Sequence, residues 1–294
     1  MSGWAIALRR WVDSAAGWPP AGRGVDWARV VPFLAMHAGC LGVFWTGASP
    51  ALALLAAATF AARMFAITAF YHRYFSHRAF RASRAAQFLF ALLGASAAQR
   101  GPLWWASQHR HHHAHADRPE DAHSAARHGF AWSHAGWFLA RENFPARLAL
   151  VPDLARYPEL RFLDRYDVLA PAALALALYA AGGLPYVVWG FCVSTVALWH
   201  ATFAINSLAH RYGTRRYATR DDSRNNLWLA LLTFGEGWHN NHHHFPGSAR
   251  QGFFWWEIDL TWYGLKLLAA VGLVRELRPV PVAVREARRE GGRR

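Results

Sequence analysis

Cysteine, lysine and acidic residues are scarce in this chain of 294 residues. The two cysteines, Cys40 and Cys192, both lie in apolar stretches, which excludes a disulfide framework and a thiolate metal site and leaves packing as their role. Lys266 is the only lysine, so arginine carries almost all of the positive charge behind the formal net charge of +14. Charged residues make up only 17% of the chain and hydrophobic residues 54%, which favours a membrane protein over a soluble globular one.

The arginines form no continuous basic stripe, which argues against nucleic-acid binding. They gather in a middle segment, in the tail 285–294 and near the N-terminus, at Arg9, Arg10, Arg23 and Arg29. This distribution is typical of the side of a membrane protein that faces anionic lipid headgroups. We therefore expect a lipid bilayer as a partner and no nucleic acid, and we predict that the tail 285–294 is disordered.

Four apolar stretches have the composition of transmembrane helices, although the first and third are short. They cover residues 30–45, 51–71, 168–181 and 186–207. The links within each pair carry no charge, so the sequence predicts two transmembrane hairpins, 30–71 and 168–207. The arginine asymmetry places both termini and the polar segments 1–29, 72–167 and 208–284 on the cytoplasmic side. We predict one all-α, multi-pass membrane domain, 1–294, with four membrane helices under a cytoplasmic helical cap.

Most of the 17 histidines fall into clusters beside these apolar stretches. Positions i, i+3 and i+4 of a helix share one face. Two clusters have this spacing, namely His109, His112 and His113, and His239, His242 and His243. His72 and His77 are five apart, roughly 140° around an ideal helix, so they can share a centre only if the helix ends or distorts between them. His111 and His244 break the repeat and are not expected to be ligands.

The aligned histidines are too many for one ordinary metal site. A tetrahedral zinc is satisfied by four ligands, and carboxylate-bridged di-iron bundles use glutamates that these clusters lack. The pattern therefore favours two metals held by imidazole nitrogen, with room for a small molecule. The nine candidates are His72, His77, His109, His112, His113, His210, His239, His242 and His243, and Asn206, four residues before His210, offers an amide that could hold a water.

Three acidic residues lie just outside the clusters. Asp117, Asp121 and Glu236 are candidates for acceptors that fix the tautomers of ligand histidines. Asp117 and Asp121 could equally be solvated loop acids. Glu236 stands between Gly235 and Gly237, three residues before the candidate ligand His239, which favours the acceptor role there.

Together these motifs resemble the membrane-bound fatty acyl desaturases of the stearoyl-CoA Δ9 type. The resemblance covers about residues 51–266 and rests on His72-Arg-Tyr-Phe-Ser-His77, Trp104-Trp105, His109-Arg-His-His-His113, Asn206-Ser-Leu-Ala-His210 and Gly235-Glu-Gly-Trp-His-Asn-Asn-His-His243. It implies an oxidoreductase that uses two non-haem irons, O₂ as cosubstrate and two electrons. Such an enzyme introduces a cis double bond into a saturated acyl chain. The chain would be carried as a thioester, with acyl-CoA as the first expectation, or in a membrane lipid.

The resemblance also implies how the ligands divide between the two irons. One iron would be held by His72, His77, His109, His113 and His242. The other would be held by His112, His210, His239 and His243, with Asn206 reaching it through a water.

Substrate contacts follow from the same resemblance. The acyl tail would lie in a tunnel, with Phe60 and Ala56, roughly 18 to 24 Å up the helix from His72, as candidates to close its far end. Packing against lipid or a neighbouring helix is the other interpretation of these two residues. Trp105 and Arg141 match substrate-contact positions, whereas Ser107 stands where members that use coenzyme A often carry a basic residue.

The tail has no haem-binding or iron–sulfur motif, so we expect a separate electron donor resembling cytochrome b5, ferredoxin or rubredoxin. An acidic carrier could dock on the arginine-rich face, although lipid contact would also explain those arginines.

Three other functions stay open. A histidine-rich membrane hydroxylase or alkane monooxygenase would form an alcohol, a membrane zinc hydrolase would use fewer histidines, and a metal sensor or transporter would place its ligands along the span.

Overall fold

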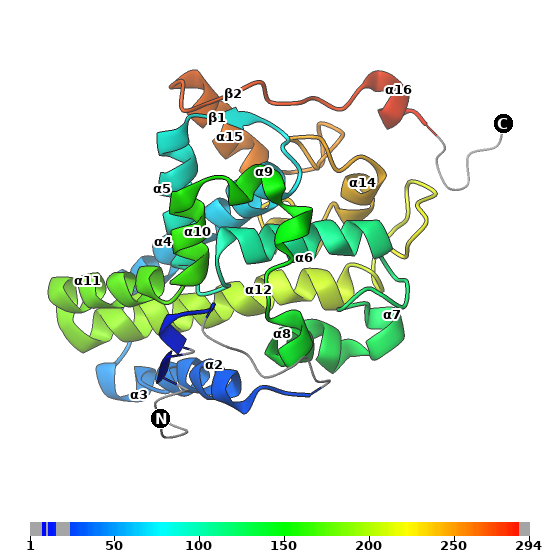
Figure 1. Cartoon of the computed structure of the whole chain (residues 1–294). Helices are drawn as coiled ribbons and strands as arrows, with labels where there is room; N and C mark the ends of the chain where they lie inside the picture. The colour runs from blue at the N-terminus through cyan, green and yellow to red at the C-terminus, as the bar shows by residue number, and fades with distance from the viewer. Residues whose placement is uncertain (1–7, 10, 16–23, 288–294) are drawn as a thin grey trace. The chain divides into compact units, whose positions relative to one another are not determined.

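The structure, a computed structural model, describes residues 8–9, 11–15 and 24–287 and is mostly helical (Figure 1). The chain divides into two compact units. The first contains the chain up to Ala66 together with Phe88–Trp105 and Phe138–His200, and the second contains Ile67–Gln87, Ala106–Trp137 and the chain from Ala201 onward. Residues 288–294 of the basic tail, with Arg10 and Arg23, lie outside the described residues.

The first unit is built from apolar helices and short connecting turns. Its elements are α2 (Trp27–Cys40), α3 (Val43–Thr46), α4 (Pro50–Phe65), most of α5 (Arg84–Ala95), the start of α6 (Pro102–His115), most of α8 (Trp137–Leu139), η3 (Arg141–Asn143), η4 (Leu148–Leu150), α9 (Pro152–Ala155), α10 (Pro158–Arg165), α11 (Leu169–Tyr186), η5 (Val187–Val193) and the start of α12 (Ser194–Leu208). Helix α4 begins where the sequence favours a start, because the Ser49 hydroxyl accepts from Leu52 N at 3.2 Å and Pro50 needs no partner for its nitrogen. Helices α2, α4 and α11 all pack against η5.

Within the described residues, three helical stretches are long and apolar enough to cross a membrane: Arg29–Thr46, Pro50–Ser76 and Leu169–Leu208. The third has 40 residues, about 60 Å if it were straight, which is twice the thickness of a bilayer core. It is not straight, because Gly182 and Gly183 have non-helical dihedral angles and Gly183 has a φ of 66°. The chain therefore breaks between the two stretches predicted as the second hairpin, and α11 folds back on η5 (Figure 1).

The second unit carries all three histidine clusters. Its elements are η1 (Ala66–Ser76) from Ile67 on, β1 (Arg81–Ala82), the body of α6, α7 (Ala125–His128), η2 (Trp132–Gly136), the end of α12, α13 (Leu227–Leu232), α14 (His239–His244), α15 (Leu260–Ala270), β2 (Val274–Arg275) and α16 (Val282–Arg285). Strands β1 and β2 pair antiparallel, with Arg81 opposite Arg275 and Ala82 opposite Val274 (Figure 1). The Asp259 carboxylate caps α15 by accepting from Trp262 N at 2.9 Å.

Candidate metal centre

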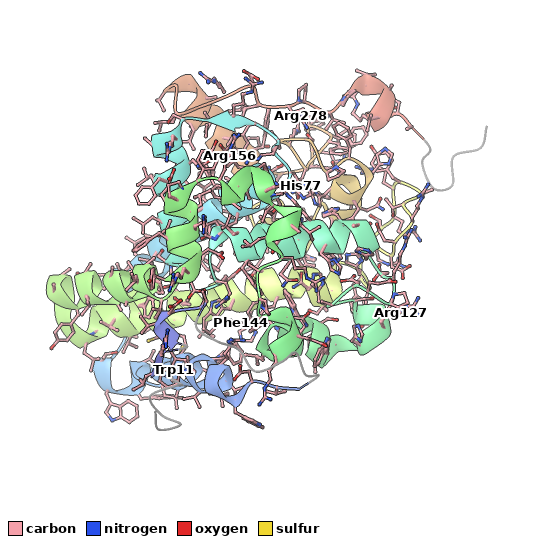
Figure 2. The ribbon with its side chains drawn as sticks, viewed as in Figure 1. Trp11, His77, Arg127, Phe144, Arg156 and Arg278 are labelled. Carbon is pink, nitrogen blue, oxygen red and sulfur yellow. The ribbon has the colours of Figure 1, made fainter. Side chains whose placement is uncertain are left out.

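The first histidine pair lies on a distorted helix, as its spacing required. Residues Ala66–Ser76 form the π-helix η1, in which hydrogen bonds join residues five apart. His72 therefore comes onto the same side as His77, which follows directly after η1 and is labelled in Figure 2. Their ring centroids are 5.1 Å apart. The predicted distortion between the two residues is confirmed.

The other two clusters lie on regular helical turns. His109, His112 and His113 occupy the C-terminal half of α6, and His239, His242 and His243 occupy the short helix α14. Helix α14 has only 6 residues, so its start must be fixed from outside. The side-chain oxygen of Asn225 does this, because it accepts from the main-chain nitrogens of Asn240 at 3.0 Å and Asn241 at 3.1 Å.

The nine predicted ligands converge as two groups, within each of which the ligand atoms lie within 4.8 Å of one another. The five-histidine group consists of His72, His77, His109, His113 and His242, and the four-histidine group of His112, His210, His239 and His243. The ring nitrogens face one another closely. Nε2 of His109 is 2.8 Å from Nε2 of His77 and 3.0 Å from Nε2 of His113, and in the other group Nε2 of His210 is 3.0 Å from Nε2 of His239.

Burial keeps most of these rings neutral. It is the largest cause that lowers the pKa well below the usual value, and neighbouring imidazoles lower it further, in His77, His109, His113, His239 and His242. A neutral imidazole has one N–H and one lone pair. Nε2 of His109 faces two other Nε2 atoms, at 2.8 Å and 3.0 Å, and can donate to no more than one of them, so the remaining lone pairs repel unless a cation lies between the rings. Two buried ring nitrogens, His239 Nδ1 and His243 Nε2, have no hydrogen-bond partner among the described residues. The donor set therefore fits a pair of metal ions with affinity for nitrogen.

The three acids named from the sequence each contact a candidate ligand. Nδ1 of His210 donates to Asp117 at 2.8 Å, Nδ1 of His112 donates to Asp121 at 3.0 Å, and Nδ1 of His72 contacts Glu236. Such bonds fix the tautomer so that Nε2 is free to bind a metal. Although burial opposes it, the bond and charge of His210 lower the pKa of Asp117 to about 2, so this acid is ionised at neutral pH.

A fourth acid was missed by the sequence interpretation. Asp221, in the loop before α13, accepts from Nδ1 of His243 at 2.9 Å. Although burial opposes it, the His243 hydrogen bond and charge lower the pKa of Asp221. Burial in turn lowers the pKa of His243 to about 4, against the raising effect of Asp221. The available signal was the adjacent acidic pair Asp221-Asp222 in an otherwise arginine-rich segment.

Behind His72 lies a buried charged network that spacing could not reveal. The Arg73 guanidinium lies 3.0 Å from Glu236 Oε1 and 2.9 Å from Asp259 Oδ1. Gln251 donates to Glu236 at 2.9 Å and lies 3.2 Å from Nδ1 of His72. Gly235 makes this packing possible, because its φ is 124° and a Cβ there would lie 2.5 Å from Asp259 Oδ1.

The histidines excluded by spacing lie outside both groups. His111 makes a contact of 3.0 Å with the Glu120 carbonyl, and His244 stacks on Tyr217 with a centroid distance of 4.0 Å. Asn206 lies on α12, one turn before His210.

The predicted substrate residues belong to the first unit. Ala56 is buried and Phe60 partly buried on α4, Trp105 donates to Gln99 at 3.4 Å, and Arg141 is exposed in η3. Their roles stay predictions.

Comparison with known proteins agrees with this centre. Residues 45–277 match the fatty acid desaturase family. The chain is 40% identical to an sn-2 palmitoyl-lipid 9-desaturase of Nostoc sp. over 87% of this chain and 91% of that protein. It is 38% identical to an sn-1 stearoyl-lipid 9-desaturase of Anabaena variabilis, over 86% and 94%, and 42% identical to an icosanoyl-CoA 5-desaturase of Limnanthes douglasii, over 74% and 62%. The match of motifs, sequence and clustered imidazoles identifies the chain as a member of the fatty acid desaturase family, an oxidoreductase.

Proposed function

We propose that this desaturase holds two non-haem iron ions in its two histidine groups and uses O₂ to introduce a cis double bond into a saturated acyl chain. The observation that carries the proposal is the convergence of nine imidazoles, five of them buried and four partly buried, as a group of five and a group of four. An iron pair supplies the oxidising power for an unactivated methylene, which no side chain can supply. The chain's own part is to keep the rings neutral, to fix their tautomers through Asp117, Asp121, Asp221 and Glu236, and to keep water out.

The substrate proposal is a saturated acyl chain that receives its double bond at the ninth carbon. Two of the relatives named above are lipid 9-desaturases and one is a CoA 5-desaturase, so both carriers are represented among proteins similar to this chain. Exposed Arg141 is available to an anionic headgroup. Assays with acyl-CoA and with acyl phospholipid in vesicles, followed by location of the double bond by mass spectrometry, identify carrier and position.

Chain length gives a separate test of the substrate residues. Ala56 is buried on α4, sixteen residues before His72. If it lines the far end of an acyl tunnel, Ala56→Trp shortens the preferred substrate, measured as the ratio of C16 to C18 products. An unchanged ratio in a protein that keeps its iron contradicts the tunnel role of Ala56.

For the membrane, we propose four crossings as two hairpins, with both termini and the histidine groups on the cytoplasmic side. The break at Gly182-Gly183 supports the reversal within the second hairpin.

A small acidic electron carrier is the proposed redox partner. Several arginines of the second unit are exposed and available to it: Arg118, Arg127, Arg211 and Arg220.

The central test combines metal analysis with product analysis. Protein purified without chelators should contain about two irons per chain and should form an alkene when supplied with O₂ and electrons. His112→Ala and His242→Ala should each abolish product and lower the iron content. His111→Ala is the matched control, because its ring lies outside both groups, and it should keep both. A single zinc per chain would support the hydrolase alternative, and an alcohol product the hydroxylase.

A further inference from the structure

The two histidine groups differ in the carboxylates that surround them. Three of the four rings in the four-histidine group have an acid at Nδ1, in the pairs His112–Asp121, His210–Asp117 and His243–Asp221. Among the contacts of the described residues, one ring of the five-histidine group has a carboxylate at Nδ1, namely His72 with Glu236. Each acid at the four-histidine group is also held by donors that keep it ionised; Asp117, for instance, accepts from Ser124 at 2.8 Å and from Asp222 N at 2.9 Å.

The single acid at the five-histidine group is further offset by positive charge. Glu236 shares Arg73 with Asp259, at 3.0 Å and 2.9 Å from the guanidinium. A second arginine, Arg110, donates to the carbonyls of Ser76 at 2.9 Å and Phe75 at 2.8 Å, directly before His77. Burial, the neighbouring imidazoles and Arg110 all lower the pKa of His77. Two acids and two arginines thus balance one another there. Three acids contact the rings of the other group, and Arg127 donates to the main-chain carbonyl of one of them, Asp117, at 3.1 Å, so negative charge remains in excess.

From this difference we infer that the two metal positions are unequal, and that the four-histidine position binds a divalent cation more tightly and fills first. The inference rests on the proposed di-iron function. The physical reason is that carboxylates near a cation stabilise it by charge and also make the hydrogen-bonded imidazole a stronger donor. Loss of one such acceptor typically lowers metal affinity 10- to 100-fold. We expect the first Fe(II) to bind at least about tenfold more tightly than the second.

The experiment titrates metal-free, full-length protein anaerobically with ⁵⁷Fe(II) and follows each position by Mössbauer spectroscopy. At one equivalent, one quadrupole doublet should account for most of the iron, and a second should grow only with the second equivalent. Asp221→Asn should perturb the first doublet and weaken its binding about 10- to 100-fold. Glu236→Gln should perturb the second doublet only.

Asp222→Asn is the matched control, since it removes the same charge from the neighbouring residue, whose main-chain nitrogen rather than its carboxylate makes the contact with Asp117. It should leave both doublets unchanged. Doublets that grow together in the unmodified protein, or a first doublet that responds to Glu236→Gln, would overturn the inference while leaving the di-iron proposal intact. Protein that binds no iron would overturn both. The result with the unmodified protein decides whether the two positions are unequal even if a variant fails to fold, and either variant alone assigns the doublets to their positions.

Discussion

The two compact units each bury an arginine almost completely and surround it in opposite ways. Arg73, in the second unit, is 1% exposed and contacts two carboxylates, Glu236 and Asp259. Arg63, in the first unit, is also 1% exposed, but its hydrogen bonds end at neutral oxygens. These belong to Ser194, Thr195 and the carbonyls of Ser96 and Thr59, at distances of 2.5, 2.6, 3.2 and 3.1 Å.

The difference follows from what each arginine must hold. Glu236 has to stay ionised to orient His72, so a buried carboxylate needs a buried cation beside it. Arg63 orients no candidate ligand among its described contacts, and four neutral acceptors satisfy its donors without placing a second charge in an apolar helix bundle. The guanidinium of Arg73 is therefore part of the candidate metal centre in the second unit. The guanidinium of Arg63 only holds neighbouring helices of the first unit together.

The largest expected effect comes from Arg73→Met. It leaves Glu236 and Asp259 buried, both negative and without their shared cation, which costs about 3 to 5 kcal/mol of unfolding free energy. The variant should show a lower thermal unfolding midpoint and should lose iron. Asp259→Asn added to this variant should restore part of the stability, because one stranded charge is then removed. An unchanged midpoint in the single variant would contradict the charge-balance argument.

An intermediate effect, dependent on pH, is expected at Asp164 in the first unit. Its carboxylate accepts from Trp104 N at 2.7 Å at the start of α6. The backbone of Asp164 also packs closely against Gly101, since a Cβ on this glycine would lie 2.2 Å from the Asp164 Cα. Burial, the largest cause, and nearby Asp167 raise the pKa of Asp164 to about 6 from 3.8, against the lowering effects of the Trp104 N–H and Arg100. The folded protein thus binds this proton more tightly than the unfolded chain. Unfolding free energy should fall as the pH rises from about 4 to 6, by roughly 1 to 3 kcal/mol.

Asp164→Asn should remove most of that pH dependence, because the amide oxygen still accepts from Trp104 N but cannot ionise. Unfolding midpoints measured from pH 4.5 to 7.5 check this. Asp167, which pairs with Arg100 at 2.9 Å and whose pKa is also raised by burial, accounts for any remaining slope. The same slope in the variant as in the parent would show that Asp164 is not responsible.

The smallest effect is expected from Arg63→Met. The variant loses bonds to neutral groups but no ion pair, and it also loses the cost of burying a charge. Ser194 keeps a hydrogen bond to the Gly190 carbonyl at 2.6 Å. The unfolding free energy should change by no more than about 1 kcal/mol. A loss as large as that of Arg73→Met would mean that the two arginines are equivalent.

Much of the fold and of the centre could be predicted from local patterns. The i, i+3, i+4 spacing selected the ligand faces of α6 and α14 and excluded His111 and His244, because helical geometry alone decides which side chains share a face. The apolar stretches and the Gly182-Gly183 break were also visible, since both depend on local composition. The five-residue gap between His72 and His77 required a distortion but could not say that it would be a π-helix, which depends on packing.

The sequence by itself determined the inventory of this protein: nine imidazoles at helical spacing, three acids close to them, and apolar helices long enough for a membrane. The resemblance already implied the division of the rings into groups of five and four, which helical spacing could not give and which the tertiary structure reproduces. Only the tertiary structure decided that Asp221, Gln251 and the Arg73 network contact them. The physical reason is the separation along the chain over which each effect acts. Helix periodicity acts within a few residues, whereas His72 and Gln251 are 179 residues apart and meet only because the chain between them is packed.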